Sequence, residues 1–130
     1  MTNHTNKKST GQLAIRTLAM PSDTNVNGDI FGGWVISYMD LAGLSIARKR
    51  ARCRVTTVAI DKMVFLSPVH VGDFICCYGE LLKVGRTSMT IRIETFATDE
   101  LGEGRRQVTE GVFTYVAINA EGRPIPVQES

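Results

Sequence analysis

The sequence predicts an α+β fold in which an antiparallel sheet curls around one long helix. Three observations lead to this prediction. Helical periodicity is concentrated in residues 32–50, one strand-like segment precedes it, and four strand-like segments follow it. The connections among those four segments are short and hairpin-like, whereas parallel neighbours would need crossover helices between them. We therefore expect antiparallel pairing in the sheet.

The first strand and the helix have distinct patterns. Residues 13–19 alternate as a strand that ends before Pro21, and residues 1–10 are polar and expected to be flexible. The helix begins at Gly32-Gly33 and ends in basic side chains, which suit the negative end of the helix dipole and are better explained in this way than by phosphate binding. These side chains are Arg48, Lys49, Arg50, Arg52 and Arg54.

The later segments alternate with a period of two. In one of them Met89, Ile91 and Ile93 share a face that we expect to be buried, and Gly85-Arg86 is typical of a hairpin tip. The predicted strands are 55–65, 74–84, 88–94 and 108–118, followed by an irregular tail over 119–130. Apolar side chains placed on the outer face of the last strand favour an oligomer. This outer group is Thr109, Val112, Phe113, Thr114 and Tyr115.

Length and charge limit the class of protein. The chain has 130 residues, enough for a real core, and predicts one domain spanning 1–130. A formal net charge of +2 argues against a general nucleic-acid binder. No apolar run is long enough to cross a bilayer, and the segment MTNHTNKKST lacks the hydrophobic core of a signal peptide. We therefore expect a cytoplasmic protein.

The cysteines and histidines indicate neither a disulfide framework nor a metal site. The three cysteines are odd in number, and the adjacent Cys76 and Cys77 point to opposite faces of their strand. We interpret both of them, and Cys53, as small apolar residues. Their spacing with His4 and His70 matches no zinc pattern.

Asp40 is the strongest candidate for a chemical role. On a helical wheel it falls in the apolar arc between Ala47 and Leu44, where an ionised carboxylate is costly unless hydrogen bonds or a cavity compensate. We therefore expect it to line a pocket. A position at the edge of the arc, where Asp40 would cap a loop or meet a basic partner, explains the spacing equally well.

The segment before this helix offers a hydrogen-bond donor. Residues 23–29 form a turn-rich loop, and Gly32-Gly33 opens the helix without side chains that would block approach. Free amides at a helix N-terminus suit an oxyanion or a polarised carbonyl oxygen, and Gly33 is the candidate donor. The alternative is that the two glycines relieve crowding where the helix packs on the sheet.

The chemistry of a carboxylate points to a thioester. The chain has no G-x-S-x-G, no G-x-x-x-x-G-K-[ST] and no G-x-G-x-x-G after a strand, which argues against serine hydrolases, nucleotide hydrolysis and dinucleotide redox chemistry. Without a strong general acid, a carboxylate needs a leaving group that departs unaided. A thiol with a pKa of about 8.5 is such a group, so water, a base and an oxyanion donor can suffice.

The pattern N-x-x-G-x-x-F-G-G-W over residues 25–34, with Met39-Asp40 after it, resembles the hotdog acyl-CoA thioesterases, and most closely their YciA-type branch. The resemblance continues through VTTVAIDKMVFLSPVHVGD and CCYGELLKVGRTS into the final strand. It implies a hotdog fold and hydrolysis of acyl-CoA with no cofactor beyond the CoA of the substrate. It also implies homo-oligomers, commonly trimers of dimers, whose subunits pair through their sheets and form active sites between them.

The same resemblance implies the roles of individual residues. Asp40 matches the catalytic carboxylate, acting as general base or nucleophile, and Gly33 matches the oxyanion donor. Asn25 matches the polar residue that holds the water or the thioester from the facing subunit. The coenzyme A contact is a glycine hairpin whose guanidinium and hydroxyl groups suit phosphate oxygens. It corresponds to Val84, Gly85, Arg86, Thr87 and Ser88.

Other interpretations remain open from the sequence. A non-catalytic acyl-CoA sensor or carrier could bind through the same hairpin, although Asp40 and Asn25 speak against it, and so does the lack of room for an output domain. A hotdog dehydratase is disfavoured because related folds use a histidine near the helix. Met39, Met63 and Phe65 could line an acyl tunnel, but they are better explained as core residues.

Overall fold

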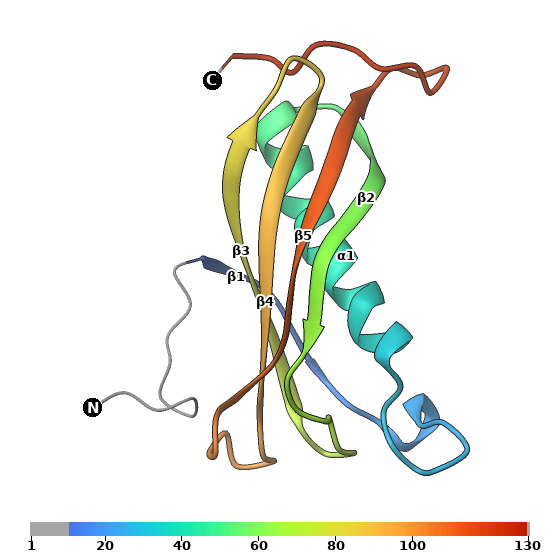
Figure 1. Cartoon of the computed structure of the whole chain (residues 1–130), viewed down its shortest axis with the longest axis vertical. Coiled ribbons are helices and arrows are strands. Elements are labelled where there is room, and N and C mark those ends of the chain that lie inside the picture. Colours follow the sequence, from blue (N-terminus) through green and yellow to red (C-terminus); the bar gives the residue numbers. More distant parts are fainter. Residues whose placement is uncertain (1–10, 130) are drawn as a thin grey trace.

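The computed structural model describes residues 11–129; residue 130 and the segment 1–10, for which flexibility is expected, lie outside the described part of the chain. One long helix, α1, covers Gly32–Ala51, and a 3-10 helix, η1, covers Pro21–Asp23. The elements follow the predicted order (Figure 1). The strands are β1 Gln12–Leu18, β2 Arg54–Phe65, β3 Phe74–Val84, β4 Ser88–Thr98 and β5 Arg106–Ile118.

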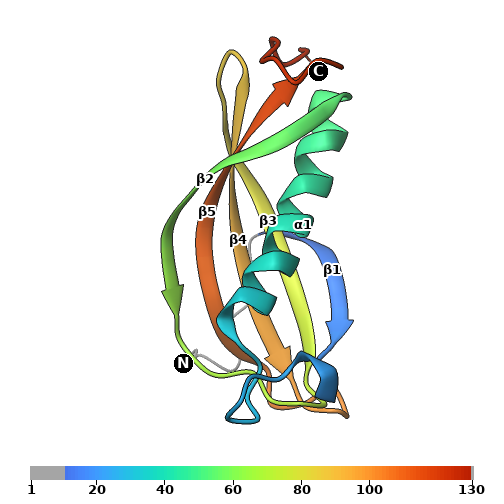
Figure 2. The same ribbon diagram turned by 90° about the vertical axis from the view of Figure 1, so that its right-hand side faces the viewer.

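The strands of the described chain form one sheet in the order β1-β3-β4-β5-β2, and all neighbours pair in antiparallel fashion, as predicted. The edge strands β1 and β2 curve around opposite flanks of α1 (Figure 2). β2 changes register against β5 between Asp61 and Val64, and Lys62 there has a left-handed φ of 53°. A bulge of this kind increases the local twist, which lets β2 bend around the helix.

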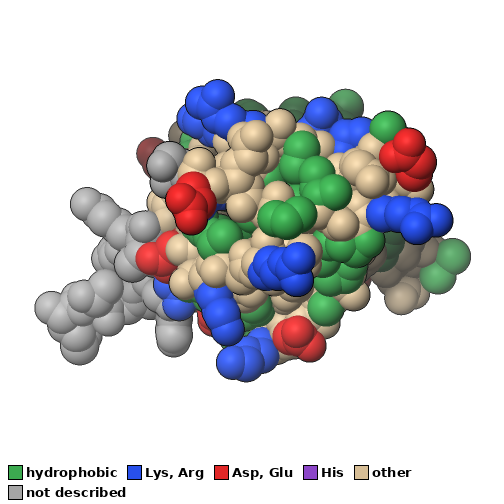
Figure 3. Space-filling view, turned by 90° about the horizontal axis from the view of Figure 1, so that it is seen from above, with side chains coloured by type: hydrophobic (Ala, Val, Ile, Leu, Met, Phe, Trp, Pro, Cys, Tyr) green, Lys and Arg blue, Asp and Glu red, His purple; other side chains and the backbone are tan. Residues whose placement is uncertain are grey.

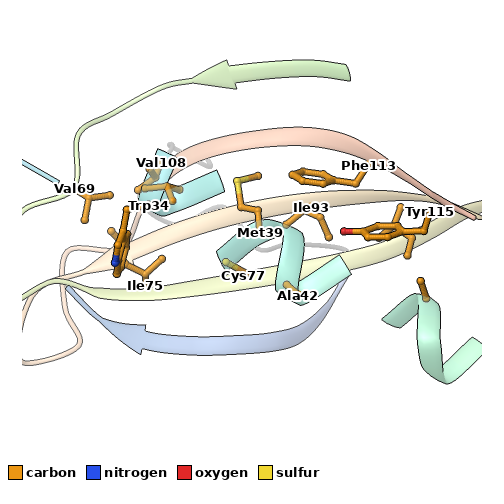
Figure 4. Close-up of a cluster of buried hydrophobic side chains, with 14 of the residues drawn as sticks. Trp34, Met39, Ala42, Val69, Ile75, Cys77, Ile93, Val108, Phe113 and Tyr115 are labelled. Carbon is orange, nitrogen blue, oxygen red and sulfur yellow. The ribbon is translucent and has the colours of Figure 1, made fainter. Parts of the chain in front are cut away.

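The core lies between α1 and the concave face of the sheet (Figure 4). Met89, Ile91 and Ile93 of β4 are fully buried there, which confirms the predicted face of this strand. The remaining members of the core include residues of α1 and β5, which pack on these side chains as one cluster. Packing of one helix face on one sheet face therefore accounts for the hydrophobic core.

The prediction for the outer face of β5 was wrong in part. Phe113, Tyr115 and Thr109 are fully buried on the side that faces α1, whereas Val112 and Thr114 are partly exposed on the other side. Successive side chains of a strand point to opposite faces, so these five residues cannot share one face. The aromatic side chains of β5 thus belong to the core, and the exposed apolar side chains lie elsewhere.

The tail is irregular, as predicted, but it is ordered against its own subunit. The Ile125 amide donates to the Ala117 carbonyl at 2.9 Å, and the Val127 amide donates to the Arg86 carbonyl at 2.8 Å. These hydrogen bonds hold residues 119–129 across the β3–β4 hairpin. In residues 11–129, no helix has the length and apolar content that a membrane span requires.

Candidate active site

Asp40 lies midway along α1 on the flank that faces β2 and β5. Its side chain is half-buried at the edge of the buried arc of the helix. Thr57 of β2 donates a hydrogen bond to Asp40 Oδ1 over 2.7 Å. The Tyr115 hydroxyl lies 3.1 Å from the same oxygen and 2.9 Å from the Asp40 backbone carbonyl oxygen. The position is therefore the edge of the arc, but the partners are hydroxyl groups rather than loop amides or a basic side chain.

The two hydroxyl groups leave Asp40 with one open carboxylate oxygen. Both contact Oδ1, and within residues 11–129 no donor reaches Oδ2. A carboxylate held through one oxygen presents the other in a defined direction. There it can accept a proton from water or attack a carbonyl carbon, so the geometry suits a general base or a nucleophile.

Thr57 and Tyr115 were not among the predicted site residues. They are register partners on β2 and β5, and their side chains meet at Asp40. Burial raises the pKa of Tyr115, and the adjacent Asp40 carboxylate raises it further, so the phenol keeps its proton and donates it. The period-two alternation of β5 could have placed Tyr115 on the helix side, but the register with β2 has no local sequence signal.

The amino end of α1 presents open backbone amides. Phe31 is the N-cap residue without a side-chain cap, and the Gly32 and Gly33 amides have no acceptor in the described part of the chain. A Cβ at Gly32 would lie 3.2 Å from the Phe65 ring, so this glycine relieves crowding. Gly33 is exposed, and a Cβ placed on it would lie 3.5 Å from the Phe31 ring. Gly33 therefore keeps an approachable donor.

Asn25 holds together the loop that precedes α1. Its Oδ1 accepts hydrogen bonds from the Asn27 amide at 2.9 Å and the Asp29 amide at 3.2 Å, which is the geometry of an Asx turn. The side chain is exposed, and among the described residues its Nδ2 group has no acceptor. This amide group can therefore donate to a ligand, although no hydrogen bond joins it to Asp40 within residues 11–129.

The predicted site residues lie at different heights along α1. Gly33 precedes Asp40 by seven residues, which corresponds to about 10 Å along the helix axis. The β3–β4 hairpin and the loop containing Asn25 lie at opposite ends of the molecule (Figure 1). Figure 3 looks onto the hairpin end, where Lys and Arg side chains surround apolar ones. A single chain therefore does not gather all predicted site residues into one pocket.

The hairpin predicted to contact coenzyme A is tightly closed. The Gly85 amide donates to the Ser88 carbonyl at 2.8 Å, and the Ala117 amide donates to the Thr87 carbonyl at 2.9 Å. The Arg86 side chain is exposed, while its carbonyl accepts from the tail. The backbone of the hairpin is thus fixed by β5 and the tail, and its guanidinium group is left facing solvent.

Other parts of the described chain add no second candidate centre. A cavity of about 560 Å³ lies on the opposite flank of α1, between Ile46 and Leu81, and does not include Asp40. Residues 11–129 contain no group of three or more His, Cys, Asp or Glu side chains that could hold a metal ion. All three cysteines are free, and burial raises the pKa of Cys77 to about 11. Cys77 packs in the core as a small apolar side chain.

A helix wrapped by a five-stranded antiparallel sheet defines a hotdog protein. The helix carries a carboxylate that hydroxyl groups from two strands hold in place, and such a carboxylate can serve a hydrolytic reaction. The family model described as the Thioesterase superfamily matches residues 27–102. This chain belongs to the Thioesterase superfamily.

Relatives and solved structures agree with this assignment. An uncharacterized acyl-CoA thioester hydrolase of Haemophilus influenzae is 51% identical over 126 residues, covering 94% of this chain and 81% of the relative. The acyl-CoA thioester hydrolase YciA of Salmonella typhimurium is 50% identical over 124 residues, covering 91% and 92%. The hexameric thioesterase y2039 from Yersinia pestis is 48% identical with a TM-score of 0.89, covering 94% and 100%. The predicted family and fold are confirmed, and the protein is a hydrolase.

Proposed function

We propose that this protein hydrolyses acyl-CoA thioesters to free carboxylic acids and coenzyme A, with Asp40 as general base or nucleophile. The observation that carries the proposal is the Asp40 carboxylate, which is held through Oδ1 and open at Oδ2. It lies in a chain about half identical to proteins named acyl-CoA thioester hydrolases. The scheme needs no cofactor, because a thiol leaves without a general acid and coenzyme A enters only with the substrate.

We place each site between two subunits. For direct attack, the carboxylate oxygen must lie within about 7 Å of the amide that holds the carbonyl oxygen of the thioester. Gly33 and Asp40 of one helix are about 10 Å apart along its axis. The Gly33 amide and the Asn25 side chain of one subunit would therefore serve the Asp40 of its neighbour, as oxyanion donor and as donor to the water or the thioester.

A homo-oligomer supplies the second subunit. β2 is an edge strand of the sheet, and apolar side chains on it and just after it are exposed. An unpaired edge with exposed apolar groups favours pairing with another chain. We propose a dimer joined through the sheets, and a trimer of dimers because the similar thioesterase y2039 is hexameric. The exposed side chains are Val58, Ile60, Val64, Phe65 and Leu66.

Residues 84–88 are the proposed contact for coenzyme A. The exposed Arg86 guanidinium can bind phosphate oxygens in bidentate fashion, and the hydroxyl groups of Thr87 and Ser88 add donors. The hydrogen bonds that close the hairpin hold these groups in place. We also propose a cytoplasmic location, which the three free cysteines support.

Mixed oligomers test both the reaction and the two-subunit site. Gly33→Pro removes one amide donor while keeping a residue that the first turn of a helix tolerates, and Asp40→Asn removes the base. Each variant alone should release little thiol from acyl-CoA. Refolding them together should restore roughly a quarter of the wild-type rate, because half of randomly paired dimers would contain one intact site.

Two outcomes would count against the proposal. Thiol release that stays absent in the mixture, while the wild type is active, would place Gly33 and Asp40 in the same site of one subunit. Saturable acyl-CoA binding by the wild type without thiol release would favour the alternative of a non-catalytic acyl-CoA-binding protein.

A further inference from the structure

Tyr115 reaches α1 through a gap that Gly43 leaves in the helix surface. A Cβ at Gly43 would lie 2.1 Å from the Tyr115 hydroxyl oxygen and 2.7 Å from its Cζ, so no side chain fits there. The hydroxyl group therefore contacts the helix backbone itself. It lies 2.9 Å from the Asp40 carbonyl oxygen and 3.1 Å from Asp40 Oδ1. The glycine thus places a proton donor beside the carboxylate.

The Tyr115 ring has little freedom to move away from this position. It is fully buried and stacks on Phe113 with ring centroids 6.4 Å apart and planes inclined by 13°. Figure 4 shows both rings beside Ile93 in the core. Close-packed side chains of this kind occupy one arrangement, so the hydroxyl position is defined by the sheet. The raised pKa of Tyr115 keeps its proton in place for donation.

We propose that Tyr115 is a positioning residue, whose hydroxyl group, admitted by Gly43, fixes the Asp40 carboxylate so that Oδ2 faces the substrate. This inference rests on the proposed function, in which Asp40 is the base or nucleophile. The Tyr115 hydroxyl proton is shared between the Asp40 backbone oxygen, which has a fixed position in the helix, and Asp40 Oδ1. This shared hydrogen bond fixes the carboxylate relative to the helix backbone. Thr57 holds the same Oδ1 from β2.

The Tyr115 contact affects the reaction rate through the orientation of the Asp40 carboxylate. Without the Tyr115 contact, the carboxylate can rotate about its side-chain bonds, and the open oxygen spends less time in the reactive direction. The carboxylate also loses a donor that stabilises its charged form. Both effects lower the rate of the chemical step, and neither changes the groups that bind coenzyme A.

Tyr115→Phe tests this role, with Tyr78→Phe as the matched control. Tyr78 lies on the outer face of the sheet, edge-on to Phe96 with centroids 5.7 Å apart. We expect Tyr115→Phe to lower kcat about ten-fold and to leave KM within about two-fold, a split that a general loss of packing would not produce. Tyr78→Phe should leave kcat and KM as in the wild type.

Gly43→Ala provides a second variant, because it displaces the Tyr115 hydroxyl without removing it. A folded Gly43→Ala protein should lose at least as much kcat as Tyr115→Phe, again with KM within about two-fold, because displacing the ring removes the same contact. A wild-type kcat in folded Tyr115→Phe or in folded Gly43→Ala would overturn the inference. If the wild type releases no thiol, or Asp40→Asn retains full turnover, the proposed function itself fails, so the two failures are distinguishable.

Discussion

On each flank of α1, a glycine allows a side chain of the facing element to approach closely, but the two contacts have different consequences. On the β3 flank, a Cβ at Gly79 would lie 2.3 Å from Ile46 Cδ1, so the glycine admits an apolar side chain of the helix. On the β5 flank, Gly43 of the helix admits the Tyr115 hydroxyl group. The first contact joins two apolar surfaces, and the second brings a proton donor to Asp40. Close helix–sheet packing thus supplies stability on one flank and orders the candidate site on the other.

Alanine substitutions at the two glycines should distinguish the contribution to stability from the contribution to the candidate site. Gly79→Ala meets the flexible end of Ile46, so we expect about 1 kcal/mol of lost stability and a kcat within about two-fold of the wild type. Gly43→Ala meets a rigid ring, so we expect about 3 kcal/mol of lost stability and a roughly 100-fold lower kcat in the folded fraction. Thermal unfolding and thiol-release kinetics measure the two quantities. Equal losses of kcat in the two variants would contradict the distinction.

Thr57→Val tests the second hydroxyl group that holds Asp40. It keeps the shape of the side chain and removes the donor that lies 2.7 Å from Asp40 Oδ1. A hydrogen bond to a charged group contributes about 1.5–3 kcal/mol, so kcat should fall about 10- to 150-fold. Thr57→Ser retains the hydroxyl group and should keep most of the activity. Equal rates in the Val and Ser variants would show that packing, not donation, is what Thr57 supplies.

Arg86→Ala changes the β3–β4 hairpin, which lies outside both flanks, and we expect it to have the smallest effect on activity. Loss of the exposed guanidinium should raise KM for acyl-CoA about five-fold with kcat nearly unchanged, because a phosphate contact is removed far from the reacting atoms. Lys83→Ala, which removes another exposed cation of the same strand end, is the control. An acyl-pantetheine substrate, which lacks the nucleotide, should not distinguish Arg86→Ala from the wild type. A raised KM with that substrate as well would argue against a phosphate contact.

The elements of the fold could be predicted from the sequence because their signals are local. Periods of 3.6 and 2 placed α1 and the strands close to their observed ends. The error at Phe113 and Tyr115 arose where neighbouring residues were assigned to one face. Strict alternation would have put both side chains against the helix.

The partners of Asp40 depend on information that no local pattern carries. Thr57 meets Tyr115 because of the register between β2 and β5, which are far apart in the sequence. Tyr115 reaches Asp40 because Gly43 lies one helical turn away on the same face. The sequence could therefore single out Asp40, but only the packed structure shows which oxygen of its carboxylate is open.

Thiol release by the wild type and Asp40→Asn, compared over short, medium and long acyl-CoA substrates, tests most directly whether Asp40 carries out the hydrolysis. Asparagine has nearly the shape of aspartate but cannot act as a base or a carboxylate nucleophile. We expect kcat to fall by a factor of about 1,000 or more on every substrate that the wild type accepts, while acyl-CoA binding persists. Turnover by Asp40→Asn within a few-fold of the wild type would contradict the central role assigned to this carboxylate.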